Sequence, residues 1–270
     1  MREVTVAMVQ MAPKLGDIEA NLERMGKWVE DICHEQKTDL IVFPELATTG
    51  YECGVRFADL AEHINGHTVS YLAERAADFR VHVAFGMVEK QRVESVVYNT
   101  AVLIDPQGEV NATYRKVHLR GEERLAFRPG YRFSVSETAF GVVGLLLGWD
   151  LAFPEAARSL AMQGAELLCV CANWERPHAP AWRTYCLTRA LENSLFVAAC
   201  NRIGEEYTYE FFGNSLMIGP RGESFSALDE GVDSYGIAAL DLDEVRKNRE
   251  ETQLMQIRQP RSYLDIVRMY

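Results

Sequence analysis

Three short segments place reactive residue types at points where apolar or extended runs of the sequence end. Glu45 follows a run that ends in Phe-Pro, Lys116 follows a run that ends in Tyr-Arg, and Gly148-Trp149-Asp150 follows three leucines. Ligands bind at the carboxyl ends of strands in open α/β sheets. A carboxylate among apolar groups can act as a base once its pKa rises, and an ammonium can stabilise an oxyanion. We expect the three ends to converge on one pocket.

Strands and helices that could position these residues alternate along the chain. Near-continuous apolar or extended runs predict strands at 4–11, 39–43, 82–88, 96–104, 112–115, 141–147, 166–172, 195–201, 214–218 and 234–242. Apolar residues at helical spacing and helix-start signals predict helices at 17–35, 68–80, 154–164, 181–193 and 243–247. The order of elements is that of an α/β protein.

The absence of a Gly-Ser-rich or Pro-rich linker predicts that residues 1–270 form a single domain. Two strand–helix halves of similar composition favour two mixed β-sheets packed face to face with helices on both outer faces. Periodicity alone does not distinguish this arrangement from an open doubly wound sheet. Residues 250–270 form a C-terminal tail of mixed polarity that packs either on a partner subunit or on its own domain.

Composition and charge narrow the functional classes. The chain is 48% hydrophobic and carries a formal net charge of −11, so nucleic acid and membrane surfaces are poor partners. We expect no secretory signal and no membrane span, and therefore a cytoplasmic protein. Several of the six cysteines lie in apolar runs and should be buried, reduced thiols. No Cys/His spacing predicts a metal site, and we expect no cofactor.

Six segments are more specific together than any one of them is alone. They are FPEL with TTGY at 43–46 and 48–51, YRKVHL at 114–119, GWDLAFPE at 148–155, ANW at 172–174, RALEN at 189–193 and NRIG at 201–204. In this order they resemble the nitrilase superfamily of carbon–nitrogen hydrolases, with a lean toward its short amidase-like members. The resemblance implies an αββα sandwich and a Glu-Lys-Cys site that hydrolyses amides or nitriles through a thioester.

Transfer of the family pattern assigns roles to single residues. Glu45 becomes the general base, Lys116 the oxyanion partner and the Trp149 amide a second donor to the oxyanion. A second glutamate that positions the substrate lies at 122 or 123, and spacing favours Glu123. The residues expected to bind the substrate, a small-molecule amide, are Tyr51, Trp149, Asn173 and Trp174. The family's usual self-association suggests a homodimer or higher homo-oligomer.

The sequence departs from the family at the nucleophile. The position of the cysteine is occupied by Gly148, which cannot form a thioester, so we expect the enzyme to be inactive or strongly impaired. Three explanations stay open: an engineered substitution, a natural loss of catalysis in favour of ligand binding or regulation, and takeover by another cysteine, of which Cys53 is the best candidate.

Three further polar residues have a structural interpretation that we favour over a catalytic one. His118 resembles a catalytic imidazole but is better explained as a hydrogen-bonded histidine near the pocket. Asp150 should hold the turn that follows the three leucines. Arg189 and Glu192, three residues apart on a helix, should form an ion pair.

Overall fold

The strands of the computed structural model, which describes residues 2–92 and 96–268, form two six-stranded sheets and one two-stranded ribbon. The first sheet has the order β14 (Ser234–Asp241), β1 (Glu3–Gln10), β2 (Leu40–Val42), β3 (His82–Lys90), β4 (Val97–Ile104) and β5 (Val110–Arg115). The second sheet has the order β13 (Ser224–Ala227), β12 (Leu216–Ile218), β9 (Phe196–Asn201), β8 (Leu167–Ala172), β7 (Val142–Leu147) and β6 (Val135–Glu137). The ribbon pairs β10 (Ile203–Glu205) with β11 (Glu210–Phe212).

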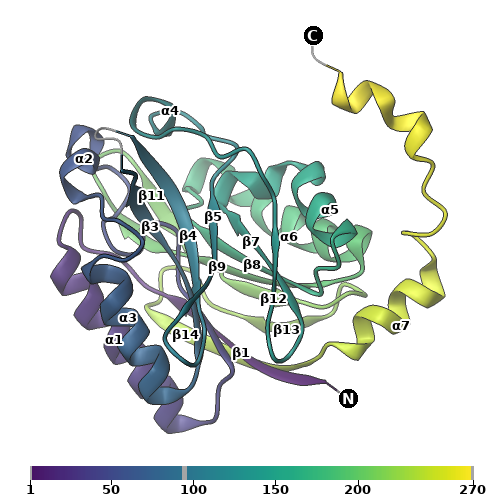
Figure 1. The fold of residues 1–270 in the computed structure, drawn as a ribbon, viewed down its shortest axis with the longest axis horizontal. Helices are drawn as coiled ribbons and strands as arrows, with labels where there is room; N and C mark the ends of the chain where they lie inside the picture. The colour runs from purple at the N-terminus through teal and green to yellow at the C-terminus, as the bar shows by residue number, and fades with distance from the viewer. Residues whose placement is uncertain (1, 93–95, 269–270) are drawn as a thin grey trace.

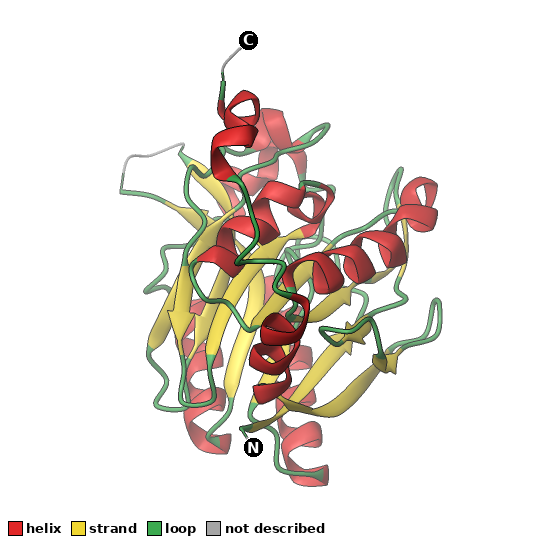
Figure 2. Cartoon of the chain, turned by 90° about the vertical axis from the view of Figure 1, so that its right-hand side faces the viewer, coloured by secondary structure: helices red, strands yellow, loops and turns green. Residues whose placement is uncertain are grey.

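The two sheets face each other and are covered on their outer faces by helices (Figures 1 and 2). In each sheet three neighbouring strands are parallel and the flanking strands are antiparallel. Helices α1 (Ile18–Glu35) and α3 (His67–Phe79) lie outside the first sheet, and α5 (Pro154–Met162) and α6 (Ala179–Asn193) lie outside the second. The predicted αββα sandwich is confirmed, and the open doubly wound sheet is excluded.

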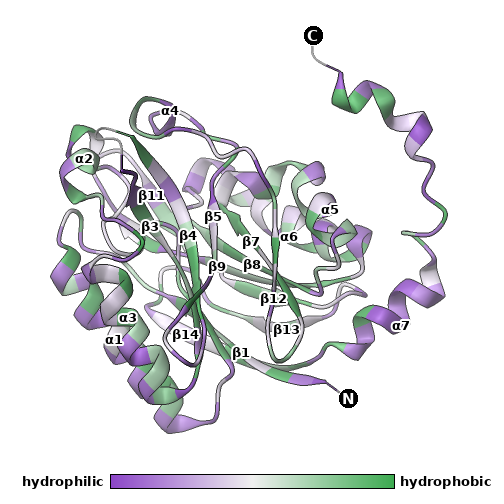
Figure 3. Ribbon diagram, viewed as in Figure 1, coloured by the Kyte–Doolittle hydropathy of each residue, from purple (hydrophilic) through white to green (hydrophobic). Residues whose placement is uncertain are grey.

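The apolar run of β1 shows why strands of this chain do not alternate between apolar and polar residues. Val4, Val6 and Met8 belong to the core between the sheets, whereas Ala7 and Val9 pack with α1 and α3. A strand that is covered on both faces must be apolar at both sets of positions. Figure 3 shows the same contrast: hydrophobic colour follows the strands, and hydrophilic colour marks the outer surfaces of the helices.

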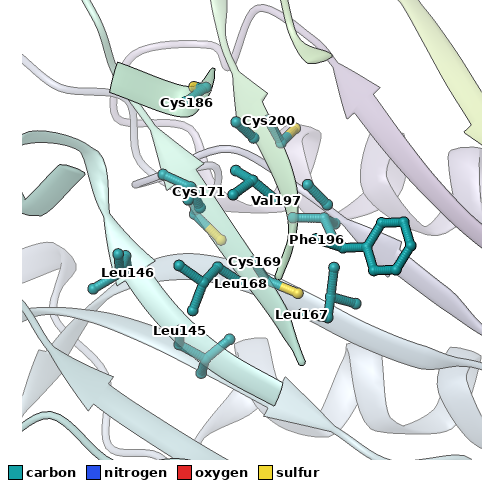
Figure 4. Close-up of a cluster of buried hydrophobic side chains, with 14 of the residues drawn as sticks. Leu145, Leu146, Leu167, Leu168, Cys169, Cys171, Cys186, Phe196, Val197 and Cys200 are labelled. Carbon is teal, nitrogen blue, oxygen red and sulfur yellow. The ribbon is translucent and has the colours of Figure 1, made fainter. Parts of the chain in front are cut away.

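The cysteines of the second sheet behave as small core residues. Cys169, Cys171 and Cys200 are fully buried, and Figure 4 places them among leucine and valine side chains of β7, β8 and β9. All six cysteines of the chain are free. Burial raises the pKa of the Cys169 thiol to about 12 and that of Cys171 well above its ordinary value. The prediction that these cysteines are buried is confirmed for Cys169, Cys171 and Cys200.

Some elements differ from the sequence prediction. The helix expected at 243–247 is α7 (Asp243–Thr252), which is longer, and the strand expected from residue 96 begins at Val97. Residues 93–95 lie outside the described residues. Strands β6, β10, β11 and β13 were not predicted, and each of them is three or four residues long. The remaining short helices are η1 (Gly54–Arg56), α2 (Phe57–Leu60), α4 (Glu123–Ala126), η2 (Gly148–Ala152), η3 (Arg176–His178) and η4 (Pro260–Val267).

The C-terminal tail extends away from the sandwich (Figure 1). After α7 it turns and ends in η4, and its last two residues, 269 and 270, lie outside the described part of the chain. Among the described residues, no helix combines the length and the apolar character that crossing a lipid bilayer demands.

Candidate active site

The structure brings the three predicted strand ends together. Lys116 Nζ lies 2.7 Å from Glu45 Oε1, and both side chains are at most 3% exposed. A Cβ atom added to Gly148 would overlap Glu45 Oε2 and would lie 3.4 Å from Lys116 Nζ. One carboxylate, one ammonium and the backbone of residue 148 therefore meet at a single buried point. Their catalytic roles stay predictions, but the convergence that those roles require is present.

Glu45 is fixed by the strands around it. The segment after β2 lies directly on β3 at Gly86, where an added Cβ would come within 2.6 Å of Glu45 Cα. Only glycine permits that close approach. Asn99 of β4 donates its side-chain amide to Glu45 Oε1 at 2.7 Å, and the Asn173 backbone N–H donates to Oε2 at 3.0 Å. Both oxygens thus have fixed directions.

Burial determines how Glu45 titrates. Removal from water raises its pKa to about 7, even though the ammonium of Lys116 acts in the opposite direction. A carboxyl with a pKa near neutrality can accept and return a proton at physiological pH. The environment of Glu45 is therefore suited to general-base chemistry.

Lys116 is held between two carboxylates. Its Nζ lies 2.6 Å from Glu123 Oε1 as well as 2.7 Å from Glu45. Burial disfavours the ammonium, but the two carboxylates outweigh it and raise the Lys116 pKa above its ordinary value. Glu123 is 3% exposed, whereas Glu122 points to solvent. The geometry therefore places Glu123 in the position expected for the second glutamate.

The turn that carries Gly148 is organised by Asp150. Gly148 has φ +34°, in the left-handed region that favours glycine. Asp150 is fully buried and accepts hydrogen bonds from the Tyr114 hydroxyl at 2.7 Å and from the His118 backbone N–H at 2.9 Å. His118 Nδ1 lies 2.8 Å from the same carboxylate, and its ring stacks on Phe153. Asp150 and His118 thus make the hydrogen bonds that their structural interpretation predicts.

Helix α6 fixes the same turn from behind. Arg189 donates to the backbone carbonyls of Leu151 and Ala152, at 2.9 and 3.0 Å. It also forms the predicted ion pair with Glu192, at 2.8 Å. The arginine thus connects α6 to η2 and stabilises the backbone around residue 148.

A small cavity of about 20 Å³ opens beside Lys116. It is lined by the four residues predicted to bind substrate, Tyr51, Trp149, Asn173 and Trp174, together with Lys116, Glu123, Arg120 and Glu175. A volume of this size admits one or two water-sized groups. An adjoining outer pocket of about 480 Å³ shares Arg120 and Trp149 with the cavity. These two residues therefore line both the inner cavity and the outer pocket.

Sequence reasoning missed several residues of this site. Asn99, which orients the Glu45 carboxylate, gave no signal beyond one polar residue inside an apolar strand. Arg120 forms an ion pair with Glu175 and lies 4.3 Å from the centre of the Trp149 ring. Its partner is 55 residues away in sequence, so no local pattern reveals the pair.

Cys53 is not placed to replace the missing thiol. It packs with Leu46, Phe57 and Phe127 in a separate apolar cluster, and its thiol donates to the Thr49 carbonyl. Burial raises its pKa to about 11. Cys53 is absent from the residues that line the cavity. Among the described residues, no group of three or more His, Cys, Asp or Glu side chains is arranged to hold a metal ion.

Comparison with known proteins agrees with the fold and identifies the family. The family model described as carbon-nitrogen hydrolase matches residues 5–250. A probable nitrilase of Schizosaccharomyces pombe is 42% identical over 91% of this chain and 93% of its own. The crystal structure of a carbon-nitrogen hydrolase from Helicobacter pylori G27 superposes with a TM-score of 0.93 at 26% identity, covering 99% of both chains.

A mutant of the amidase from Nesterenkonia sp. AN1 is similar as well, with a TM-score of 0.82 and 26% identity. The match covers 94% of this chain and 97% of the amidase, which carries the acetamide moiety of fluoroacetamide covalently added at its active-site cysteine. From its sequence, its sandwich fold and these relatives, the chain belongs to the carbon–nitrogen hydrolases of the nitrilase superfamily.

Proposed function

We propose that this chain carries an amidase-type site that binds a small carboxamide but lacks the thiol needed for thioester chemistry. One observation carries the proposal. A side chain at position 148 would begin within contact of both Glu45 Oε2 and Lys116 Nζ. The base and the oxyanion partner therefore flank the point from which a nucleophile would project.

The reaction that the geometry supports can be written for a cysteine at position 148. Its sulfur would attack the amide carbon while its proton passes to Glu45, and Lys116 with a backbone N–H would stabilise the oxyanion. Return of that proton to nitrogen would release ammonia and leave a thioester, which water would then hydrolyse. With glycine at this position the first bond does not form.

The Nesterenkonia amidase supports this proposal, because its adduct formed at a cysteine of a related fold and retained a small acetamide moiety. The free cysteines of this chain agree with a reducing compartment, so a cytoplasmic location is part of the proposal.

The test is ammonia release from propionamide by three proteins: the chain itself, Gly148→Cys and Gly148→Ala. We expect release only from Gly148→Cys, by at least about 1000-fold over the other two. The alanine variant is the matched control, because it adds the same Cβ without a thiol. Both variants should lose roughly 1–3 kcal/mol of stability, since φ at residue 148 is positive and the Glu45 carboxylate must move aside.

The alternative function is a non-catalytic ligand-binding or regulatory protein, and the same experiment distinguishes it. If none of the three proteins releases ammonia, and circular dichroism shows that all three are folded, the result favours that alternative. Turnover by the unaltered chain would contradict the proposal, and Cys53→Ala would then show whether Cys53 supplies the nucleophile.

We also propose that the chain forms a homodimer through its tail. The tail presents large apolar side chains that are 39–78% exposed: Leu254, Ile257, Tyr263, Leu264, Ile266 and Val267. Between the tail and α5 lies a groove of about 820 Å³. An apolar segment that stands away from its own core is a typical contact surface between subunits. A second copy of the chain would cover it.

A further inference from the structure

One residue of the cavity has an unusual hydrogen-bonding state. Asn173 is 6% exposed, yet neither its Oδ1 nor its Nδ2 has a hydrogen-bond partner among the described residues. A buried polar atom without a partner costs about 1–3 kcal/mol. Buried side-chain amides in folded proteins therefore nearly always have partners, and an exception points to a ligand or to a bound solvent molecule.

The backbone around Asn173 is fixed, so the point from which its side chain extends is held in place. The Asn173 N–H donates to Glu45 Oε2 at 3.0 Å. The next residue, Trp174, donates its backbone N–H to Asn201 Oδ1 at 2.7 Å, and Asn201 Nδ2 returns a bond to the Trp174 carbonyl at 3.2 Å. Asn173 directly follows β8, so the strand before it and the hydrogen-bonded Trp174 after it both restrain its backbone.

Several other polar groups that line the cavity are already hydrogen-bonded, whereas the side-chain amide of Asn173 is not. Lys116 is bound to Glu45 and Glu123, and the indole N–H of Trp174 donates to the His178 carbonyl. An asparagine side chain offers one N–H and one C=O side by side. The complementary group is another amide that carries N–H and C=O on the same edge.

We propose that Asn173 is a specificity-determining residue that binds the carboxamide of the ligand through two parallel hydrogen bonds. This inference rests on the proposed function of the site. The side-chain Nδ2–H of Asn173 donates to the ligand carbonyl, and the ligand N–H donates to Asn173 Oδ1. The second lone pair of the ligand carbonyl stays available to Lys116, which lines the same cavity.

Amide geometry turns this pairing into a selection rule. A primary amide always has an N–H on the same side as its carbonyl oxygen. A simple secondary amide prefers the trans form by about 2.5 kcal/mol, which puts its substituent on that side instead. A nitrile has neither group. The site should therefore select primary amides against N-alkyl amides and against nitriles.

The small cavity fits the polar end of such a ligand. Its volume of about 20 Å³ suits the oxygen and nitrogen of a carboxamide and little more. The carbon chain of the ligand would extend past Arg120 and Trp149, which line both spaces, into the outer pocket. Displacement of the Arg120 side chain from Glu175 would open that path.

The test compares two isomers of equal size, propionamide and N-methylacetamide, with propionitrile as a third ligand. Binding to the full chain, which has no nucleophile at residue 148, is measured by isothermal titration or by saturation-transfer NMR. We expect propionamide to bind roughly 10- to 100-fold more tightly than its isomer and than the nitrile. Equal binding of the two isomers would overturn the inference even if no variant is made.

The variant that removes the pair is Asn173→Leu, which keeps the shape of the side chain. It should weaken propionamide roughly 10- to 100-fold and leave N-methylacetamide nearly unchanged, so the selectivity between isomers disappears. Asn193→Leu is the control, because Asn193 is a fully buried asparagine on α6 that does not line the cavity.

Two negative results have different meanings. If the unaltered chain binds none of the three ligands, the proposed function itself fails, and this inference fails with it. If the chain selects propionamide and Asn173→Leu keeps that selectivity, only the role of Asn173 is wrong. A loss of affinity that is equal for all three ligands would show that Asn173 supports the shape of the cavity and does not form the paired hydrogen bonds with the ligand amide.

Discussion

At the scale of single residues, the position of Glu45 and the absence of a side chain at residue 148 depend on each other. Glu45 Oε2 accepts from the Asn173 N–H and occupies space that a Cβ on residue 148 would need. Glycine therefore does more than remove a thiol, because it also allows the carboxylate to adopt this orientation. Restoring cysteine requires the carboxylate to turn away, and this rearrangement is the main structural cost of that variant.

The raised pKa of Glu45 predicts a dependence of stability on pH. The pKa is about 7 in the folded chain and near 4.5 when the group is solvated. Below pH 4.5 the group is protonated in both states and contributes no penalty. As the pH rises from about 4.5 to about 7, the unfolded chain loses this proton first, so the folded state becomes relatively less stable.

Glu45→Gln tests that sign. Glutamine does not ionise, so this part of the pH dependence should vanish. The free energy of unfolding of the variant, relative to the unaltered chain, should rise by about 3 kcal/mol between pH 4.5 and pH 8. Urea unfolding at a series of pH values measures the difference. Parallel curves for the two proteins would contradict the assignment.

At the scale of elements, the site is an assembly of strand ends. Glu45 follows β2, Lys116 follows β5, Gly148 follows β7 and Asn173 follows β8. Two of these strands belong to each sheet, so the site exists only because the sheets pack face to face. The turn after β7 is the element whose direction matters most, and Asp150 is its main anchor.

Asp150→Asn is expected to destabilise this turn. The carboxylate accepts from the Tyr114 hydroxyl and from the backbone N–H of His118, and an amide nitrogen at either oxygen position would face a donor. Loss of a buried charged acceptor of this kind costs roughly 2–4 kcal/mol. The midpoint of urea unfolding reports it. His118→Ala is the control. It alters a side chain that is 26% exposed and should lower the free energy of unfolding by only about 1 kcal/mol. Equal losses of stability for the two variants would contradict this account.

At the scale of the whole molecule, the sandwich and the tail differ in how they are stabilised. The sandwich buries apolar residues on both faces of its central strands. The tail contacts the body through a few groups, including Met255 Sδ at 3.0 Å from Arg158 Nη1, while its apolar side chains stay exposed. A second copy of the chain is the economical way to cover them.

Leu264→Asp tests the proposed dimer. Leu264 is 55% exposed and lines the groove beside α5, so a charge there should weaken self-association at least about tenfold. Light scattering coupled to size-exclusion chromatography gives the mass as a function of concentration. Val55→Asp is the control, since Val55 is 93% exposed and lies outside the groove. A monomeric mass for the unaltered chain at every concentration would rule out the dimer.

The sequence by itself determined the order of the elements, because burial of a strand or helix leaves a local record in its apolar pattern. The α/β order of elements and the buried cysteines were predictable for this reason, the sandwich followed from the family resemblance, and the ion pair of Arg189 with Glu192 followed from their helical spacing. The absence of a thiol at Gly148 is a covalent fact that needs no coordinates. The full length of α7 was missed, since its polar surface carries little apolar periodicity.

Only the tertiary structure decided which residues of the site are hydrogen-bonded to one another. Asn99 and Glu45 are 54 residues apart, and Asn173 and Glu45 are 128 apart, yet each pair shares a hydrogen bond. No local pattern encodes such a contact, because it exists only once two sheets have packed. The same packing removes water from Glu45 and raises its pKa, and it leaves the side-chain amide of Asn173 without a hydrogen-bond partner in the described part of the chain. The sequence gives the type of each residue, but the removal of water from a side chain and its hydrogen-bond partners depend on the fold.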